Sequence, residues 1–331
     1  MKIAKQLELL GLDETRRRIA GEAATPRERE RLLQRVDLAH EMLSTMPDAE
    51  DLGFLHSGLC QTCLPHSRPA SNHAIWRRTS GRFTLSITPG SVTRLGAPPG
   101  DDGWVGVPYG AKARLILFHL QTEGMKSRTV NLGPSLSAFL RSLGLPVSGG
   151  PRGSIAAVRE QALRIARCSF TLQWTDTDAS GATRTMISDT RIVDGLELWE
   201  SGKSDDWNGT VELSPRFHEH LREHAVPLDK RAIAHLSGNS LGLDLYALLA
   251  YRLPRLGREM HLRWAALQSQ IGSEESAMKE LARRVRQVLP SVLDVYPHAD
   301  VDVTPHGLLL KPSKPAVPKT MVNGVRLVEG R

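Results

Sequence analysis

The chain has 331 residues, of which 40% are hydrophobic and 24% charged, and its formal net charge at pH 7 is +7. Three cysteines in a chain of this length exclude a disulfide framework, and every apolar run is shorter than the roughly 18 residues that suggest a membrane span. The length predicts about two domains, and the positive charge favours a polyanionic partner. We therefore expect a cytoplasmic protein without a membrane anchor.

Residues 1–52 are rich in charged side chains and contain no motif that carries chemistry. Thr25 and Glu28 form a capping box, with Pro26 at the first helical position, for a helix that runs through Leu43. We expect an N-terminal helical arm that packs on the body of the protein or becomes ordered on contact with a partner.

Four potential metal ligands, His56, Cys60, Cys63 and His66, follow the arm within one short stretch. Zinc takes four nitrogen or sulfur ligands, but structural zinc sites usually draw them from two separated knuckles. A closed tetrahedral site here would require a sharp backbone reversal between the ligands. We therefore expect a loop or core packing at this stretch, and no bound metal or cofactor.

The middle of the chain predicts a first folded unit, which begins after a loop rich in glycine and proline at 95–103. Its elements are short and change type at turn residues, such as Gly144 and the glycine-rich run at 149–153. In chain order we expect a helix over 108–123, a strand over 129–132, a helix over 135–143, a helix over 154–167, and two strands over 170–174 and 183–189.

Residues 273–293 predict a helix with two unlike faces, one apolar and one basic. The apolar residues recur at the three- and four-residue spacing that places side chains on one side of a helix. They are Met278, Leu281, Val285, Val288 and Val292. Before this helix we expect a helix over 240–253, a strand over 260–263 and a helix over 264–271, and after it two strands over 301–303 and 308–310.

Both units therefore share one element order, namely helix, strand, helix, turn, helix and hairpin, which is the order of a winged helix-turn-helix. We predict an α+β fold with two tandem winged-helix domains behind the helical arm. The expected divisions are the arm at 1–52, a first winged-helix domain with an N-terminal extension at 53–228, a second winged-helix domain at 229–315, and an extended, proline-containing tail at 316–331.

A helix of this kind enters the major groove of DNA, where Arg, Lys and Gln read base edges and phosphates. A basic face alone is a weak signal, because many surface helices carry several cations. The repeated element order strengthens the interpretation. The candidate DNA-binding residues are Ser276, Lys279, Arg283, Arg286 and Gln287 on the second unit, Arg152, Gln161, Arg164 and Arg167 on the first, and Lys311 and Lys314 after the second hairpin.

An enzyme would need a constellation of reactive side chains, and the sequence contains none that we recognise. It has no phosphate-binding glycine loop of the P-loop type and no G-x-S-x-G elbow. A relaxase would need a pair of metal-binding histidines and a nucleophilic tyrosine, and no tyrosine here lies near such a pair. We therefore expect a binding protein without catalytic residues.

Several stretches of the chain carry a resemblance to a known family. They are 56–62 (HSGLCQT), 106–117 (GVPYGAKARLIL), 135–141 (SLSAFLR) with Leu143 and Gly144, 226–229 (VPLD) and 308–318. In these stretches the sequence resembles the plasmid replication initiators of the RepA C-terminal type. This resemblance implies binding to repeated origin sequences (iterons), opening of the adjacent AT-rich duplex, recruitment of the host initiator and replicative helicase, and self-repression as a homodimer. The alternative is a winged-helix transcriptional repressor, which contacts DNA in the same way.

Overall fold

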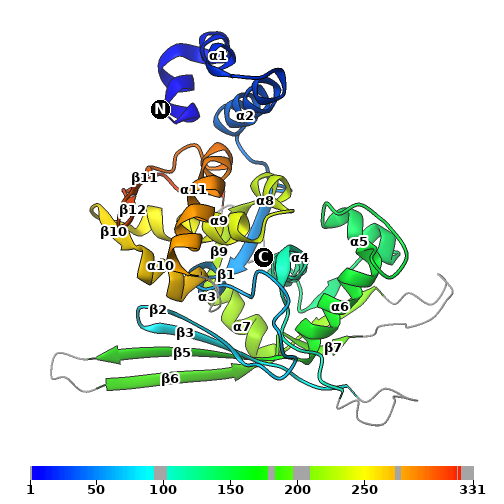
Figure 1. Ribbon diagram of the computed structural model, residues 1–331. Helices are drawn as coiled ribbons and strands as arrows, with labels where there is room; N and C mark the ends of the chain where they lie inside the picture. Colours follow the sequence, from blue (N-terminus) through cyan, green and yellow to red (C-terminus); the bar gives the residue numbers. More distant parts are fainter. Residues whose placement is uncertain are drawn as a thin grey trace.

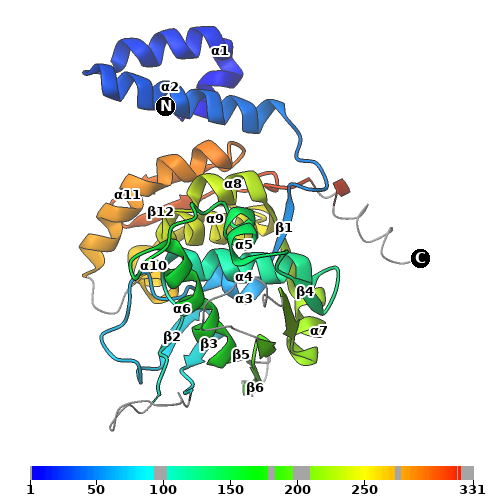
Figure 2. The same cartoon turned by 90° about the vertical axis from the view of Figure 1, so that its right-hand side faces the viewer.

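The computed structural model places three layers on top of one another (Figure 1). A helical hairpin lies at one end, a helical body with small sheets lies in the middle, and a four-stranded sheet lies at the other end. The side view in Figure 2 shows the same order of layers. The residues that the structure describes are 2–92, 103–177, 183–196, 209–272, 277–318 and 320–321.

The predicted arm is a hairpin of α1 (Ile3–Glu22) and α2 (Pro26–Ser44). The predicted cap is present, since Thr25 Oγ1 accepts a hydrogen bond from the Glu28 backbone N–H at 3.2 Å. The two helices enclose a small apolar core of their own. The arm also packs on the body, where α2 lies beside α11 (Met278–Val295) (Figure 2) and Arg35 forms an ion pair with the buried Asp294.

The second unit has the predicted elements in the predicted order. Its three strands form an antiparallel sheet in which the last strand lies between the other two. The elements are α9 (Ser240–Arg252), β10 (Met260–Arg263), α10 (Trp264–Ile271), α11, β11 (Val301–Thr304) and β12 (Gly307–Leu310), with the sheet order β10-β12-β11.

The first unit repeats this arrangement. Its sheet order, β4-β8-β7, again places the last strand between the other two. Ser135 caps its second helix, since its Oγ accepts from the Ala138 N–H at 3.1 Å. The elements are α4 (Gly110–Gly124), β4 (Thr129–Asn131), α5 (Leu136–Ser142), α6 (Ser154–Arg167), β7 (Val193–Leu196) and β8 (Thr210–Leu213).

The predicted hairpin after α6 exists, but the expectation that it completes the first unit was wrong. Its strands, β5 (Ser169–Thr177) and β6 (Thr183–Thr190), extend a separate sheet with β2 (Trp76–Ser80) and β3 (Phe83–Thr88) in the order β2-β3-β5-β6. The apolar residues explain the pairing, because those of β3 stand opposite those of β5 and bury one common face. The matched pairs are Phe83 with Trp174, Leu85 with Leu172, and Ile87 with Phe170.

The two units are joined by elements from both sides of the expected boundary near residue 228. β1 (Leu52–His56) pairs antiparallel with β9 (Ala225–Asp229), and the chain continues from them into α3 (Ser57–Gln61) and α8 (Lys230–Leu236). α7 (Pro215–His224) precedes β9. Buried side chains of α4, α9 and α11 belong to one continuous apolar core, so the two units do not have separate cores.

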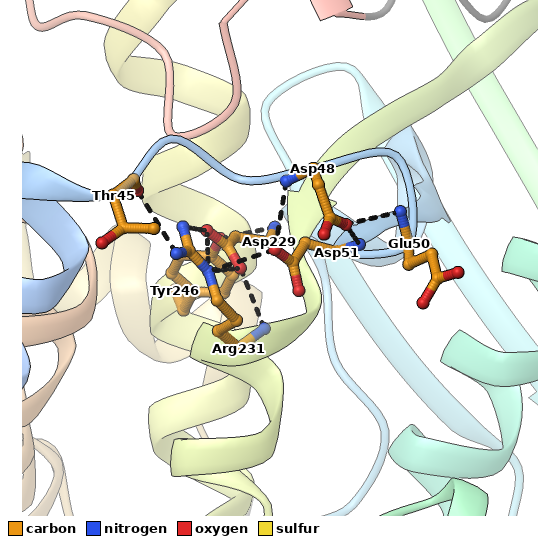
Figure 3. A network of polar contacts seen from close by, with 7 residues as sticks. All are labelled: Thr45, Asp48, Glu50, Asp51, Asp229, Arg231 and Tyr246. Atoms are coloured by element: carbon orange, nitrogen blue, oxygen red, sulfur yellow. Dashed lines mark hydrogen bonds and ion pairs between the residues drawn. The ribbon is translucent and has the colours of Figure 1, made fainter.

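A polar network holds the end of the arm against this junction (Figure 3). Asp229 caps α8 by accepting from the Arg231 backbone N–H at 2.9 Å, and the Arg231 guanidinium bonds both oxygens of the same carboxylate. Arg231 also donates to the carbonyl of Thr45 at 3.3 Å, and the Tyr246 hydroxyl accepts from the Asp229 N–H at 2.9 Å. Asp229 and Arg231 together thereby connect the arm, α8 and α9.

The described part of the tail is held against the body as well. Residues 311–315 have no helix or strand, residues 320–321 are helical, and Val317 is buried against Leu52 and Phe54. Of the helices in the described ranges, none has the length and apolar character that crossing a bilayer requires.

Candidate nucleic-acid interface

The outer face of α11 carries most of the candidates of the second unit. Four of them, Lys279, Arg283, Arg286 and Gln287, are exposed there, while Ser276 lies outside the described residues. The opposite face is buried as predicted, with Leu281, Val285 and Val292 in the core. Met278 was wrongly assigned to that face, because the first turn of α11 extends past the core and leaves this side chain 48% exposed.

Arg283 is held in one orientation by neighbours on its own helix. Its Nε and Nη2 donate to the two carboxylate oxygens of Glu280, at 2.9 and 2.5 Å, and its Nη1 donates to Gln287 Oε1 at 3.3 Å. The hydrogen bonds from Arg283 hold the pKa of Glu280 below its usual value, so this carboxyl is ionised near neutral pH. A guanidinium has five N–H donors, so two of them remain for a base edge or a phosphate.

Arg286 lies at the side of α11 that faces the turn between β11 and β12. Its guanidinium carbon is 5.1 Å from the centre of the Trp264 ring, and the Trp264 indole N–H donates to the carbonyl of Pro305 in that turn at 3.0 Å. Arg263 and His306 are exposed on the strand and turn beside it. Neither was among the sequence candidates, although an exposed Arg263 follows from the alternation along β10.

Lys311 and Lys314 do not lie beside that turn. They follow the other end of β12, and the Lys311 ammonium forms ion pairs with Asp302 at 2.9 Å and Asp300 at 3.7 Å. These carboxylates raise the pKa of Lys311, first through the bond to Asp302, and they neutralise its charge. Lys314 is exposed on a hollow next to Met46 at the end of the arm. We therefore do not retain the two lysines as part of a surface formed by α11 and the turn.

On α6 the structure corrects two of the predicted outward residues. Gln161 and Arg164 are each only 3% exposed, because they form hydrogen bonds with backbone groups of the loop that precedes α4. Gln161 Oε1 accepts from the Tyr109 backbone N–H at 2.8 Å, and Arg164 donates to the carbonyl of Val107 at 3.0 Å while it pairs with Glu160 at 2.9 Å. The buried face of α6 is therefore wider than its apolar stripe, since the loop presents polar backbone groups to it.

The cations that α6 does expose are Arg152, just before the helix, and Arg159. Arg152 was among the candidates predicted from the sequence and Arg159 was not. Arg167 is half-buried and donates twice to the carbonyl of Ser91, at 2.9 and 2.7 Å, which ties it to the preceding loop.

The four potential ligands near the start of the body are not brought together. His56 contacts His220, and the Cys60 thiol faces the carbonyl of Leu55. Within the part of the chain that is described, one group of three potential ligands forms instead, Cys63, His66 and Asp244, with the ligand atoms within 4.8 Å of one another. The Arg114 guanidinium already takes both oxygens of Asp244 at 2.7 Å, so a metal dication there would have to displace a buried cation.

Residues 107–270, from the loop before α4 to the end of α10, match the family model described as plasmid encoded RepA protein. Over these residues the chain is similar to plasmid encoded RepA proteins, which agrees with the resemblance found in the sequence.

Two solved structures of domains 2 and 3 of RctB align with much of the chain. One, a selenomethionine derivative, has 12% sequence identity and a TM-score of 0.48, and the alignment covers 77% of this chain and 98% of that one. The other has 13% identity and a TM-score of 0.43, with 75% and 85% covered. No curated protein matches the chain.

Proposed function

We propose that both units are winged helix-turn-helix domains, which bind one duplex of repeated origin sequences and place α11 and α6 in successive major grooves. The observation that carries this proposal is the exposed cationic face of α11, with Lys279, Arg283 and Arg286, on the helix that precedes the hairpin. That position is the one from which the second helix of a helix-turn-helix reads DNA.

The charges on this surface suit the two kinds of contact that a DNA-binding protein makes. Lys279, at the start of α11, is suited to a phosphate, where a flexible ammonium acts as a point charge. Arg283 and Gln287 are suited to base edges, because a fixed guanidinium and an amide can each make paired hydrogen bonds. The exposed Arg263 and His306 extend the surface toward the minor groove on one side of α11.

The steps after binding follow from the class of protein. We propose that bound initiators open the adjacent AT-rich duplex with binding energy alone, without a catalytic step, and that they recruit the host initiator and the replicative helicase. We also propose that the chain forms a homodimer that represses its own gene. A winged-helix transcriptional repressor without a role in replication is the second candidate, because the same surface would serve it.

The experiment is a replication assay with a plasmid that carries the origin but lacks this gene. Supplied from a second replicon, the parent protein should maintain the plasmid, and a footprint on the origin should cover about two helical turns. The double variant Lys279→Ala/Arg283→Ala should lose both activities. Lys126→Ala/Arg128→Ala, which removes the same charge from a surface beyond α4, is the matched control and should keep them.

Three outcomes would contradict the proposal in different ways. Repression of a reporter without plasmid maintenance would favour the repressor. A footprint of one turn would limit DNA reading to one unit. Equal loss of function in both double variants would mean that overall charge is responsible, and not the surface of α11.

A further inference from the structure

Trp264, the first residue of α10, holds the turn between β11 and β12 with both of its N–H groups. Its backbone N–H donates to the carbonyl of His306 at 3.0 Å, and its indole N–H donates to the carbonyl of Pro305 at 3.0 Å. The side chain is only 6% exposed. Two consecutive carbonyls of an exposed turn are thus fixed to one residue.

The same side chain also contacts the outer surface of α11. The face of its ring lies 5.1 Å from the guanidinium carbon of Arg286, an arrangement in which a cation is attracted to the aromatic ring. Arg286 itself is exposed. Trp264 therefore touches the turn on one side and Arg286, a candidate DNA-binding residue, on the other.

Among the described residues, one side-chain hydrogen bond is made within the turn itself. Pro305 and His306 at its tip are exposed, and across the tip Thr304 Oγ1 donates to the carbonyl of Gly307 at 3.1 Å. Gly307 has a φ of 157°, and a Cβ there would lie 2.1 Å from the carbonyl oxygen of Leu262, so this side of the turn must stay close to β10. The tip itself is directed by the two bonds from Trp264.

We propose that Trp264 is a positioning residue for DNA binding, which fixes the turn and Arg286 relative to each other so that both reach one duplex. In this arrangement α11 enters the major groove while the turn, with His306, meets the backbone at the adjacent minor groove. The proposal rests on the function proposed above, and it assigns a role to a side chain that does not itself touch DNA.

The test is Trp264→Phe, which keeps the aromatic face and the backbone N–H but removes the indole N–H. The probes are a duplex selected by the parent protein from a random pool and a scrambled duplex of equal length. Hydroxyl-radical protection under the turn should weaken, and the salt slope should fall by about one unit as a phosphate contact is lost. Affinity for the selected duplex should fall by about 5-fold, which corresponds to the net free energy of one hydrogen bond.

Guanine protection in the major groove should persist in this variant, because the exposed residues of α11 are unchanged. A double-mutant cycle with His306→Ala measures how strongly the two residues depend on each other in DNA binding. A purely structural role of Trp264 would give no such coupling. If Trp264 acts through the turn, Trp264→Phe should have little further effect on binding in the His306→Ala protein.

Trp76→Phe is the matched control. Trp76 also donates its indole N–H to a carbonyl, that of Cys63 at 2.6 Å, and it also carries an arginine, Arg78, over its ring at 3.6 Å. It lies on β2, in the four-stranded sheet. This variant should lower the melting temperature to a similar extent and leave the footprint, the affinity and the salt slope at parental values.

The outcomes separate the two proposals. Should the parent protein select no duplex at all, the proposed function and this inference both fail. Should the parent bind while Trp264→Phe keeps the parental footprint and salt slope, or should its effect add fully to that of His306→Ala, Trp264 is only a core residue and the inference alone is overturned.

Discussion

Arg114 and Asp244 form a buried ion pair that joins the two units through their equivalent helices. Nε and Nη2 of the arginine, on α4, donate to the two oxygens of the aspartate, on α9, each at 2.7 Å, and both side chains are 8% exposed. His66 bonds one of the same oxygens at 2.8 Å, and Arg114 also donates to the carbonyls of Leu64, Pro65 and Gly110. The pair therefore fixes the relative position of the two units.

Breaking this pair from one side should be costly. Asp244→Asn should lower the free energy of unfolding by about 3–5 kcal/mol, because it leaves the buried guanidinium without its counter-charge. The double variant Arg114→Met/Asp244→Leu should cost less than the sum of its two single variants, since it leaves neither charge without its partner. Urea denaturation gives all of these values. The exposed pair Arg128 and Glu212, 3.5 Å apart, is the control, and its removal should cost about 1 kcal/mol or less. A double variant that costs as much as the two single variants together would contradict this account.

Substitutions on α11 should separate base reading from phosphate binding. Arg283→Ala should cost about 1–3 kcal/mol on the origin duplex and little on scrambled DNA, because only the specific complex loses a bidentate contact. Lys279→Ala should weaken both complexes alike and reduce the salt slope by about one unit. The measurement is a salt titration on both duplexes, with thermal melting as the control for folding. If both variants melt and bind as the parent does, α11 is not the reading helix.

Substitutions on the exposed face of α6 should affect DNA binding, and substitutions on its buried face should affect stability. Arg159→Ala should weaken DNA binding and leave the melting temperature unchanged, because its side chain is exposed. Arg164→Ala should cost about 1–3 kcal/mol of folding free energy, since the buried carbonyl of Val107 loses its donor, and the salt slope should not change. Binding isotherms and melting curves for the two variants give a direct comparison. A loss of binding in Arg164→Ala without a loss of stability would restore that residue to the interface.

Acidification should destabilise the protein through His56 and His220. Burial, and then the neighbouring His220 and His224, lower the pKa of His56 to about 3, and burial lowers the pKa of His220 as well. The geometry agrees with neutral rings. His56 Nδ1 accepts from the Gly58 N–H at 3.0 Å, so its proton lies on Nε2, which faces His220 Nδ1 at 2.8 Å.

The direction in which stability changes with pH follows from proton binding. The unfolded chain binds protons below about pH 6.5 and the folded chain does not, so this stability is present above that pH and is lost as the pH falls toward 3. His56 alone should contribute about 2 kcal/mol less at about pH 5 than at about pH 7.5. His56→Asn keeps an N-cap for α3 and should flatten the profile in urea denaturation. Equal stability of the parent at both pH values would rule this out.

Local patterns were sufficient to predict the helices and the order of the second unit. Thr25 is a cap because its hydroxyl bonds an N–H three residues later, and this requires only a short stretch of sequence. The stripe on α11 is likewise a property of one helix. Features of this kind depend on neighbours within about four residues, which a single sequence contains.

Three of the errors concern partners that are distant in sequence. The strand pairing of β5 depends on β3, about eighty residues earlier, and nothing in the hairpin itself specifies that neighbour. Gln161 and Arg164 were assigned to the surface because helical periodicity does not show that the loop before α4 requires polar partners on α6. Asp244 was read only as part of a core helix, because its partner Arg114 lies 130 residues away.

The single core shared by α4, α9 and α11 limits how this protein can be divided into parts. A chain that ends before α8 would leave the apolar side of α4 without its cover, so such a fragment should aggregate and would not report on the first unit alone. A frameshift or a proteolytic cut at the junction should therefore destroy the fold of both units at once. A half-length version of the protein should neither compete with the full chain nor replace it.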